Sequence, residues 1–271
     1  MATDTTKLLD DVLRISRADG DAIMEIYQRD DFSVETKAYH SPLTEADRAA
    51  HELISAELAR LTPAIPVWSE ESATIPFDER SGWDEFWLVD PLDGTKEFIK
   101  RNGEFTVNIA LIREHLPVLG LVHAPARGVD YYASRTAGAW RQDGAQAAQR
   151  IEVRRPAAEP ARVVGSRSHR GASLEHFLTC IGPHELVPMG SSLKLCLVAS
   201  GDADVYPRLG PTSEWDTAAA QAVVECAGGV VVDLQGRPLR YNHKAEVLNP
   251  YFIVYGDPGP DWLACADSAQ G

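Results

Sequence analysis

The feature that most constrains this chain is an apolar segment that runs directly into acidic residues. Residues 86–98 read Phe-Trp-Leu-Val-Asp-Pro-Leu-Asp-Gly-Thr-Lys-Glu-Phe, so a short run of strand character ends in Asp90 and Asp93. The proline and the Gly-Thr pair predict a tight turn with two carboxylates at the end of a buried strand, which offers hard oxygen ligands. The same pattern occurs on protein surfaces, where the aspartates only cap the turn. This segment alone leaves both interpretations open.

Acidic residues also follow two other apolar segments. Glu70 and Glu71 come directly after Trp68-Ser69, and Asp216 lies at the expected start of a helix. Asp216 taken alone is explained equally well as a helix N-cap. Carboxylates from separate elements repel one another in one place unless cations neutralise them. If the fold unites the three segments, the sequence therefore predicts a site for several Mg²⁺ ions.

Hydrophobic periodicity divides the chain into two halves. It predicts helices over residues 5–27 and from Thr44 onward, where Thr44 and Asp47 form a capping-box pattern with Asp in place of Glu. Strands are expected at 65–68 and 86–89, followed by an antiparallel meander over 105–112, 117–122, 129–133, 138–141 and 150–153. After the Pro-rich residues 154–160, strands (161–165, 185–187, 203–206, 230–233, 251–254) alternate with helices (173–181, 193–200, 214–226). We therefore predict an N-terminal α+β domain over 1–155 and a C-terminal α/β domain over 156–271.

Composition excludes several classes of protein. Lys and Arg number 26 against 40 Asp and Glu, and the net charge of −14 without a basic run argues against long nucleic acids as partners. We expect neither a signal peptide nor a transmembrane segment, since no stretch approaches ~20 apolar residues. The four cysteines lack zinc-site spacing, and we interpret them as buried thiols in a reducing compartment, which favours the cytoplasm. Their even number leaves a disulfide open. They are Cys180, Cys196, Cys226 and Cys265.

The acidic motifs together resemble those of the inositol monophosphatase superfamily, the Mg²⁺-dependent, lithium-sensitive phosphatases. Glu70-Glu71, the Asp-Pro-Leu-Asp-Gly-Thr segment at 90–95 and Trp215-Asp216 match its three metal motifs in order, over roughly residues 37–255. The resemblance implies a layered αβαβα sandwich, with an antiparallel sheet in the N-terminal half, an α/β C-terminal half and the metals in a cleft between them.

The same resemblance implies the ligands of two or three Mg²⁺ ions. Glu70, Asp90 and the Leu92 carbonyl would hold one ion. Asp90, Asp93 and Asp216 would hold a second, with Asp90 bridging the two.

The resemblance also assigns catalytic roles. Asp47 and Thr95, together with Thr44, would orient the attacking water beside Glu70. Asp47 has a structural alternative, because an acid in the first turn stabilises the helix dipole regardless of catalysis.

Three segments, 93–98, 190–194 and 206–212, are more similar to the bacterial 3′(2′),5′-bisphosphate nucleotidases within this superfamily. That similarity implies removal of the 3′-phosphate of adenosine 3′,5′-bisphosphate, a by-product of sulfate assimilation, or of its sulfated precursor. Inositol monophosphatases tend to carry an acid near Arg208, whereas a guanidinium favours a second anionic group. The residues expected to bind substrate are Asp93, Gly94, Thr95, Lys96, Ser191, Lys194, Arg208 and Asp216.

Some of these residues have ordinary structural alternatives. Lys194 and Arg208 lie next to apolar runs from which a long cation can extend to solvent. Lys96 is equally explained as a solvated turn residue. Residues 165–169 follow a predicted strand and are a candidate anion-binding loop, in which His169 is explained as an ordinary polar surface residue. Tyr39-His40 departs from the Asp or Asn that related nucleotidases often carry there.

Two other functions remain as alternatives. One is an inositol monophosphatase or fructose 1,6-bisphosphatase of the same superfamily. The other is a non-catalytic cation-binding protein, although the Asp-x-x-Asp pattern lacks the alternating acids of an EF-hand. The sequence leaves open whether the protein is a monomer or a homodimer and whether it associates peripherally with the inner membrane.

Overall fold

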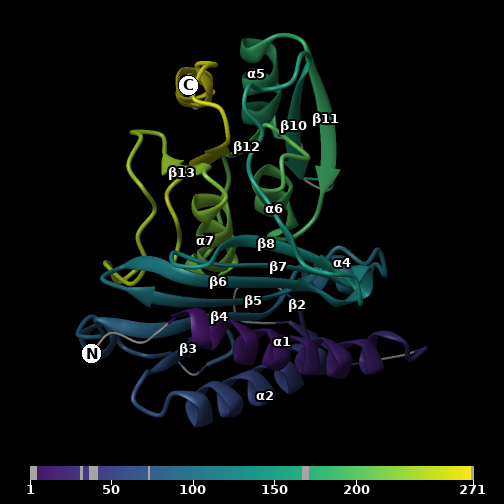
Figure 1. Ribbon diagram of the computed structural model, residues 1–271, viewed down its shortest axis with the longest axis vertical. Coiled ribbons are helices and arrows are strands. Elements are labelled where there is room, and N and C mark those ends of the chain that lie inside the picture. The colour runs from purple at the N-terminus through teal and green to yellow at the C-terminus, as the bar shows by residue number, and fades with distance from the viewer. Residues whose placement is uncertain (1–4, 31–32, 37–41, 73, 167–170, 270–271) are drawn as a thin grey trace.

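The computed structural model describes residues 5–30, 33–36, 42–72, 74–166 and 171–269, and its elements form five layers (Figure 1). Two N-terminal helices cover the outer face of a seven-stranded sheet, and a pair of helices separates that sheet from a five-stranded one. Two further helices cover the far side of the second sheet. This αβαβα order confirms the expected fold class.

The two N-terminal helices form where the apolar periodicity places them. Helix α1 (Thr5–Tyr27) buries one face, which includes Val12, Ile15 and Ile23. Helix α2 (Glu45–Leu61) begins with the predicted capping box, in which the Thr44 backbone N–H donates to Asp47 Oδ2 over 2.7 Å. The helix ends before Pro63, because proline cannot continue its hydrogen bonding.

The first sheet is the predicted meander with one added parallel strand. Strand β3 runs parallel to β4, and every later neighbour is antiparallel. The last strand is shorter than expected. In order the strands are β3 (Val67–Ser69), β4 (Glu85–Asp93), β5 (Thr106–Arg113), β6 (Leu116–Ala124), β7 (Val129–Ser134), β8 (Gly138–Asp143) and β9 (Gln149–Arg150).

A bulge in β4 corrects the prediction of a tight turn after Asp90. The strand continues to Asp93, where Asp90 pairs with Asn108 and Asp93 with Thr106. Two residues of β4 therefore face one residue of β5 between these pairs. Successive side chains of a regular strand alternate between faces, so residues three apart would lie on opposite faces. The one extra residue brings both aspartates to the same face.

The second sheet is mixed. Strands β10 and β11 are parallel, β10 and β12 are parallel, and β14 is antiparallel to both β12 and β13. The strand order is β11 (His184–Met189), β10 (Ala161–Ser166), β12 (Val205–Arg208), β14 (Phe252–Tyr255) and β13 (Val230–Asp233).

The remaining helices surround this sheet. Helices α6 (Leu193–Ala199) and α7 (Ala218–Cys226) lie between the sheets, and α5 (Ala172–Ile181) and α8 (Trp262–Ser268) lie outside (Figure 1). The helix expected over 214–226 is divided at Thr217 into a 3₁₀ turn, Glu214–Asp216, and α7. The sequence analysis did not predict the short elements α3 (Phe77–Arg80), α4 (Thr95–Ile99), β1 (Val34–Thr36) and β2 (Pro42–Thr44), nor α8.

One hydrophobic cluster joins the two sheets through the central helices. It contains Leu88 and Val122 of the first sheet, Val223 of α7 and Phe252 of the second sheet. The chain passes from one sheet to the other between β9 and β10. The division into domains at residue 155 stays a prediction.

The interpretation of all four cysteines as thiols is wrong for two of them. Cys180 of α5 and Cys265 of α8 form a disulfide, with Cα atoms 5.5 Å apart and a separation of 85 positions in the sequence. Cys196 and Cys226 are free. The pairing depends on the packing of two helices distant in sequence, one of which the sequence analysis did not foresee.

Candidate active site and metal centre

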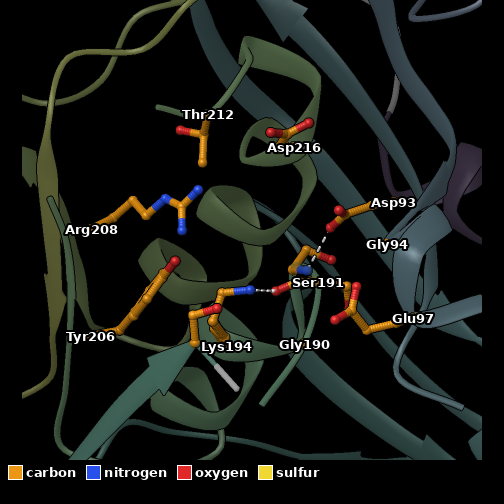
Figure 2. A pocket seen from close by; sticks show the side chains of 12 residues that line it. Asp93, Gly94, Glu97, Gly190, Ser191, Lys194, Tyr206, Arg208, Thr212 and Asp216 are labelled. Carbon is orange, nitrogen blue, oxygen red and sulfur yellow. Dashed lines mark hydrogen bonds between the residues drawn. The ribbon is translucent and has the colours of Figure 1, made fainter. Parts of the chain in front are cut away.

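Residues from several elements line a pocket of about 150 Å³ between the two sheets (Figure 2). Asp93 and Asp216 lie on one side of it, and Lys194, Tyr206 and Arg208 lie across from them. The lining residues are Asp93, Gly94, Glu97, Ser166, Gly190, Ser191, Ser192, Lys194, Tyr206, Arg208, Thr212 and Asp216.

Three predicted metal ligands form a compact group. Asp90, Asp93 and Asp216 each place one carboxylate oxygen within 4.8 Å of the others. Burial raises the pKa of both Asp93 and Asp216, and the charge of Asp93 raises the pKa of Asp216 further. Clustered, desolvated carboxylates are the oxygen donors that Mg²⁺ binds, and a cation would relieve their repulsion. The residues present therefore fit a divalent cation.

Glu70 and Leu92 lie at the edge of this group. The Glu70 backbone N–H donates to the Val89 carbonyl over 3.0 Å, which fixes Glu70 beside the end of β4. Its charge raises the pKa of Asp93 and Asp216, although its carboxylate is not part of the compact group of three. The Leu92 backbone N–H donates to Asp90 Oδ1 over 3.1 Å. The structure thus brings all five predicted metal ligands to one region.

The two carboxylate oxygens of Asp47 make different contacts, one within the helix cap and one toward the metal motif. Its Oδ2 accepts hydrogen bonds from the backbone N–H and the hydroxyl of Thr44, and the Asp47 backbone N–H donates to Thr44 Oγ1 over 3.4 Å, which completes the capping box. Its Oδ1 accepts a hydrogen bond from Thr95 Oγ1 over 3.2 Å. The same hydroxyl lies 3.4 Å from the Leu92 carbonyl oxygen, which links Asp47 to the metal motif. Helix capping therefore leaves one carboxylate oxygen directed at Thr95.

Asp216 is held in a comparable way. Ser213 is the N-cap of the 3₁₀ turn, and Asp216 lies at position N3 of the capping box. The Ser213 backbone N–H donates to Asp216 Oδ2 over 2.9 Å, so Asp216 is not the N-cap itself. The preceding Trp215 packs edge-on against Trp68, with ring centroids 5.8 Å apart. This contact joins the segment before Asp216 to the strand before Glu70.

A buried arginine, which the sequence analysis did not single out, supports that contact. Arg80 is 3% exposed, and its guanidinium lies 4.3 Å from the ring centroid of Trp68. It donates to Asn242 Oδ1 over 2.5 Å and to the Ala245 carbonyl over 2.6 Å. The Asn242 backbone N–H in turn donates to Glu214 Oε2 over 2.7 Å. Arg80 therefore connects β3 to the turn that carries Asp216.

We expect Arg80→Ala to lower the free energy of unfolding by about 3 kcal/mol, because it leaves Asn242 and two backbone carbonyls without their buried donor. Arg80→Lys should recover only part of the loss, since an ammonium lacks the planar fork. Urea denaturation measures both, with Arg60→Ala as the control because the Arg60 side chain is 72% exposed. A loss under about 1 kcal/mol for Arg80→Ala would contradict this prediction.

Two of the cations predicted to bind substrate face the pocket. Lys194 Nζ donates to the Ser191 carbonyl over 2.5 Å and lies 5.7 Å from the Tyr206 ring centroid. Burial, together with nearby Arg208, lowers the pKa of Lys194 to about 8 against the opposing charge of Asp93. Arg208 Nη2 donates to the Pro211 carbonyl over 2.6 Å, whereas its buried Nε has no hydrogen-bond partner among the described residues.

Other predicted residues are placed differently. Gly94 and Ser191 line the pocket, but Lys96 is exposed and does not. Tyr39, His40 and His169 lie outside the described residues. Six further residues line the pocket that were not predicted to bind substrate. Five lie in the segments 93–98, 190–194 and 206–212, and Ser166 lies outside them. The five are Glu97, Gly190, Ser192, Tyr206 and Thr212.

The fold and the carboxylate cluster agree with comparisons to known proteins. The model of the inositol monophosphatase family matches residues 7–256, and the chain therefore belongs to that family. Within it, the chain is 50% identical over 248 residues to the Escherichia coli K12 3′(2′),5′-bisphosphate nucleotidase CysQ, which covers 91% of this chain and 99% of that protein. The Haemophilus influenzae nucleotidase of the same name is 38% identical, with 97% of each chain covered.

Solved structures of proteins from this family have a similar fold. The crystal structure of CysQ from Bacteroides thetaiotaomicron superimposes with a TM-score of 0.81 at 40% identity and covers 92% of this chain and 97% of that one. A Thermotoga maritima inositol monophosphatase gives a TM-score of 0.80 at 26% identity, with 97% and 98% covered.

Proposed function

We propose that this protein is a Mg²⁺-dependent phosphatase that removes the 3′-phosphate from adenosine 3′,5′-bisphosphate, or from its sulfated precursor, and releases AMP or the corresponding sulfated mononucleotide together with phosphate. One observation carries the proposal. A single pocket sets a cluster of carboxylates opposite Lys194 and Arg208. Identity of about 50% to nucleotidases named for this reaction supports it.

Within this proposal, Glu70, Asp90, the Leu92 carbonyl, Asp93 and Asp216 would hold two or three Mg²⁺ ions. Paired divalent ions activate a water for in-line attack on phosphorus and stabilise the leaving oxygen.

Thr95 and Asp47 would manage the proton of the attacking water. Because the Thr95 hydroxyl donates to Asp47 Oδ1, the lone pairs of its oxygen remain available to accept a hydrogen bond from that water. The water proton would pass to Thr95 as the Thr95 proton passes to Asp47. The backbone N–H groups of Gly94 and Thr95 are the predicted donors to a phosphate oxygen.

Lys194 and Arg208 would recognise the second phosphate. A bisphosphate carries a second anionic group, and a charge-assisted hydrogen bond to that group is stronger than one to a polyol hydroxyl. The unpartnered Arg208 Nε and the buried Lys194 ammonium are placed for such a group. Their positive charge also offsets the net charge of −14 locally, so that an anion can approach.

A phosphate-release assay on a panel of esters tests the proposal. We expect kcat/KM for adenosine 3′,5′-bisphosphate to exceed that for inositol 1-phosphate by at least about a hundredfold, since a lost charged contact is worth ~1.5–3 kcal/mol. Fructose 1,6-bisphosphate also carries a second phosphate, so its comparison tests whether the site prefers the nucleotide. Activity should require Mg²⁺ and fall with Li⁺. Preference for either other ester would refute the substrate. Stabilisation by Mg²⁺ without release from any ester would favour a cation-binding protein.

The pKa of Lys194, about 8, predicts a pH dependence of substrate binding. The ammonium is charged below that pH and neutral above it, so KM should rise about tenfold between pH 7 and pH 9. Steady-state kinetics across this range measures the effect. The Lys194→Met variant should have a high KM at every pH in this range, and its KM should no longer rise with pH. The same slope in both proteins would contradict the role of Lys194.

Location and assembly belong to this proposal as well. Among the described residues, no helix is both long and apolar enough to cross a membrane. We propose an enzyme of sulfur metabolism that acts as a monomer or homodimer on a small nucleotide. The disulfide between Cys180 and Cys265 removes the cysteine argument for a cytoplasmic location, which stays a prediction from the sequence.

A further inference from the structure

Asn108 is a buried amide in the largely apolar strand β5, and it lies next to the carboxylate cluster. It pairs across the sheet with Asp90, and Thr106, two residues before it in β5, pairs with Asp93. Residues two apart in a strand share a face, and the bulge in β4 places the two aspartates on a common face. Asn108 is 1% exposed. Its polar atoms therefore need partners inside the protein.

Ser192 connects Asn108 to the loop before α6. The Ser192 hydroxyl donates to Asn108 Oδ1 over 2.8 Å and lies 2.9 Å from Thr106 Oγ1. The Ser192 backbone N–H donates to Asp93 Oδ2 over 2.6 Å (Figure 2). The same loop supplies Ser191, whose carbonyl accepts the hydrogen bond from Lys194. Ser192 thus contacts the metal motif and the strand beside it, and its neighbour Ser191 contacts the cationic side of the pocket.

The other half of the amide has no such partner. Asn108 Nδ2 is fully buried and makes no hydrogen bond among the described residues. It nevertheless lies beside the metal motif, because Asn108 pairs with Asp90 across the sheet and Ser192, which donates to Asn108 Oδ1, also donates through its backbone N–H to Asp93. An unsatisfied buried donor costs about 1–3 kcal/mol, so an apolar side chain would suit this strand better if Asn108 only filled space.

We propose that Asn108 is a positioning residue: its Oδ1 fixes the substrate loop through Ser192, and its unpartnered Nδ2 is the donor that would orient the Asp93 carboxylate when a divalent cation binds. This inference rests on the proposed function. It makes the cation site and the loop of residues 190–194 depend on one side chain. Losing the amide therefore changes cation affinity and substrate KM together.

The matched variants are Asn108→Leu, which keeps the approximate shape and loses both polar atoms, and Thr106→Val, which loses only a hydroxyl that contacts Ser192. Mn²⁺ binding to the substrate-free protein, followed by electron paramagnetic resonance, gives a readout independent of turnover. Steady-state kinetics and thermal melting accompany it. Asn108→Ser, which shortens the side chain and adds no volume to the core, serves if the leucine variant does not fold.

We expect the dissociation constant for Mn²⁺ to rise at least about tenfold in Asn108→Leu and Asn108→Ser, the usual effect of removing a group that orients a metal ligand. It should stay within about twofold in Thr106→Val. The asparagine variants should also show a higher KM.

Two results separate this inference from the function it rests on. Folded asparagine variants that bind Mn²⁺ as tightly as the natural protein would overturn the positioning role and leave the proposed function intact. A natural protein that binds no Mn²⁺ would overturn the metal centre itself. Equal losses of affinity in Asn108→Leu and Thr106→Val would assign the effect to the contact with the Ser192 hydroxyl that both variants lose, and would overturn the role of Asn108 Nδ2.

Discussion

Asp93→Asn should lower kcat by at least about a thousandfold while the protein stays folded. Asp93 belongs to the compact carboxylate group and also anchors the Ser192 loop, so the substitution removes a charge from the predicted cation ligands. A bound cation supplies several kcal/mol of transition-state stabilisation, and each ~1.36 kcal/mol is a factor of ten in rate. Phosphate release at saturating substrate and Mg²⁺ measures the loss. Asp21→Asn is the control, because Asp21 is exposed on α1.

When no cation is present, the loss of kcat in Asp93→Asn should not be accompanied by a loss of thermal stability. Burial raises the pKa of Asp93, so this group stabilises the fold at low pH and loses that contribution as the pH rises through its folded pKa. At pH 8, Asp93→Asn should therefore melt no lower than the natural protein without Mg²⁺. Addition of Mg²⁺ should raise the melting temperature of the natural protein, and the variant should lose most of this increase. A variant that keeps the full shift would show that Asp93 does not hold the cation.

Gly120→Ala should lower the free energy of unfolding by about 3 kcal/mol, the upper part of the range for overpacked cores. A Cβ atom at Gly120 in β6 would lie 2.1 Å from the Ala219 carbonyl oxygen and 2.7 Å from the Ala222 Cβ, both in α7. The helix would have to move away from the sheet. Urea denaturation measures the change.

The control for this substitution is Gly82→Ala, since a Cβ at Gly82 meets no atom closer than 4.0 Å. That control should change stability by under about 0.5 kcal/mol. Because Asp216 lies two residues before α7, Gly120→Ala should also weaken cation binding. A variant as stable as the control would show that the helix and sheet can separate without cost.

The sequence predicted much of this architecture because local signals were strong. The periodicity of residues 5–27, the Thr44 capping box and the alternating strands of the meander each depend on neighbours a few residues away. The short elements and the α8 helix contain too few residues to show a hydrophobic periodicity. An amide inside the apolar strand around Asn108 was a signal available in the sequence, but nothing there indicated its partner.

By itself, then, the sequence determined the longer helices, most of the strands and the acidic motifs that they carry, since local hydrogen bonding and hydrophobic pattern fix these. Only the tertiary structure decided that a bulge would turn Asp90 and Asp93 to one face, that Arg80 would support the turn before Asp216, and that Cys180 would meet Cys265. These contacts join residues far apart in the chain. Their geometry depends on how whole layers pack, which no short stretch of sequence encodes.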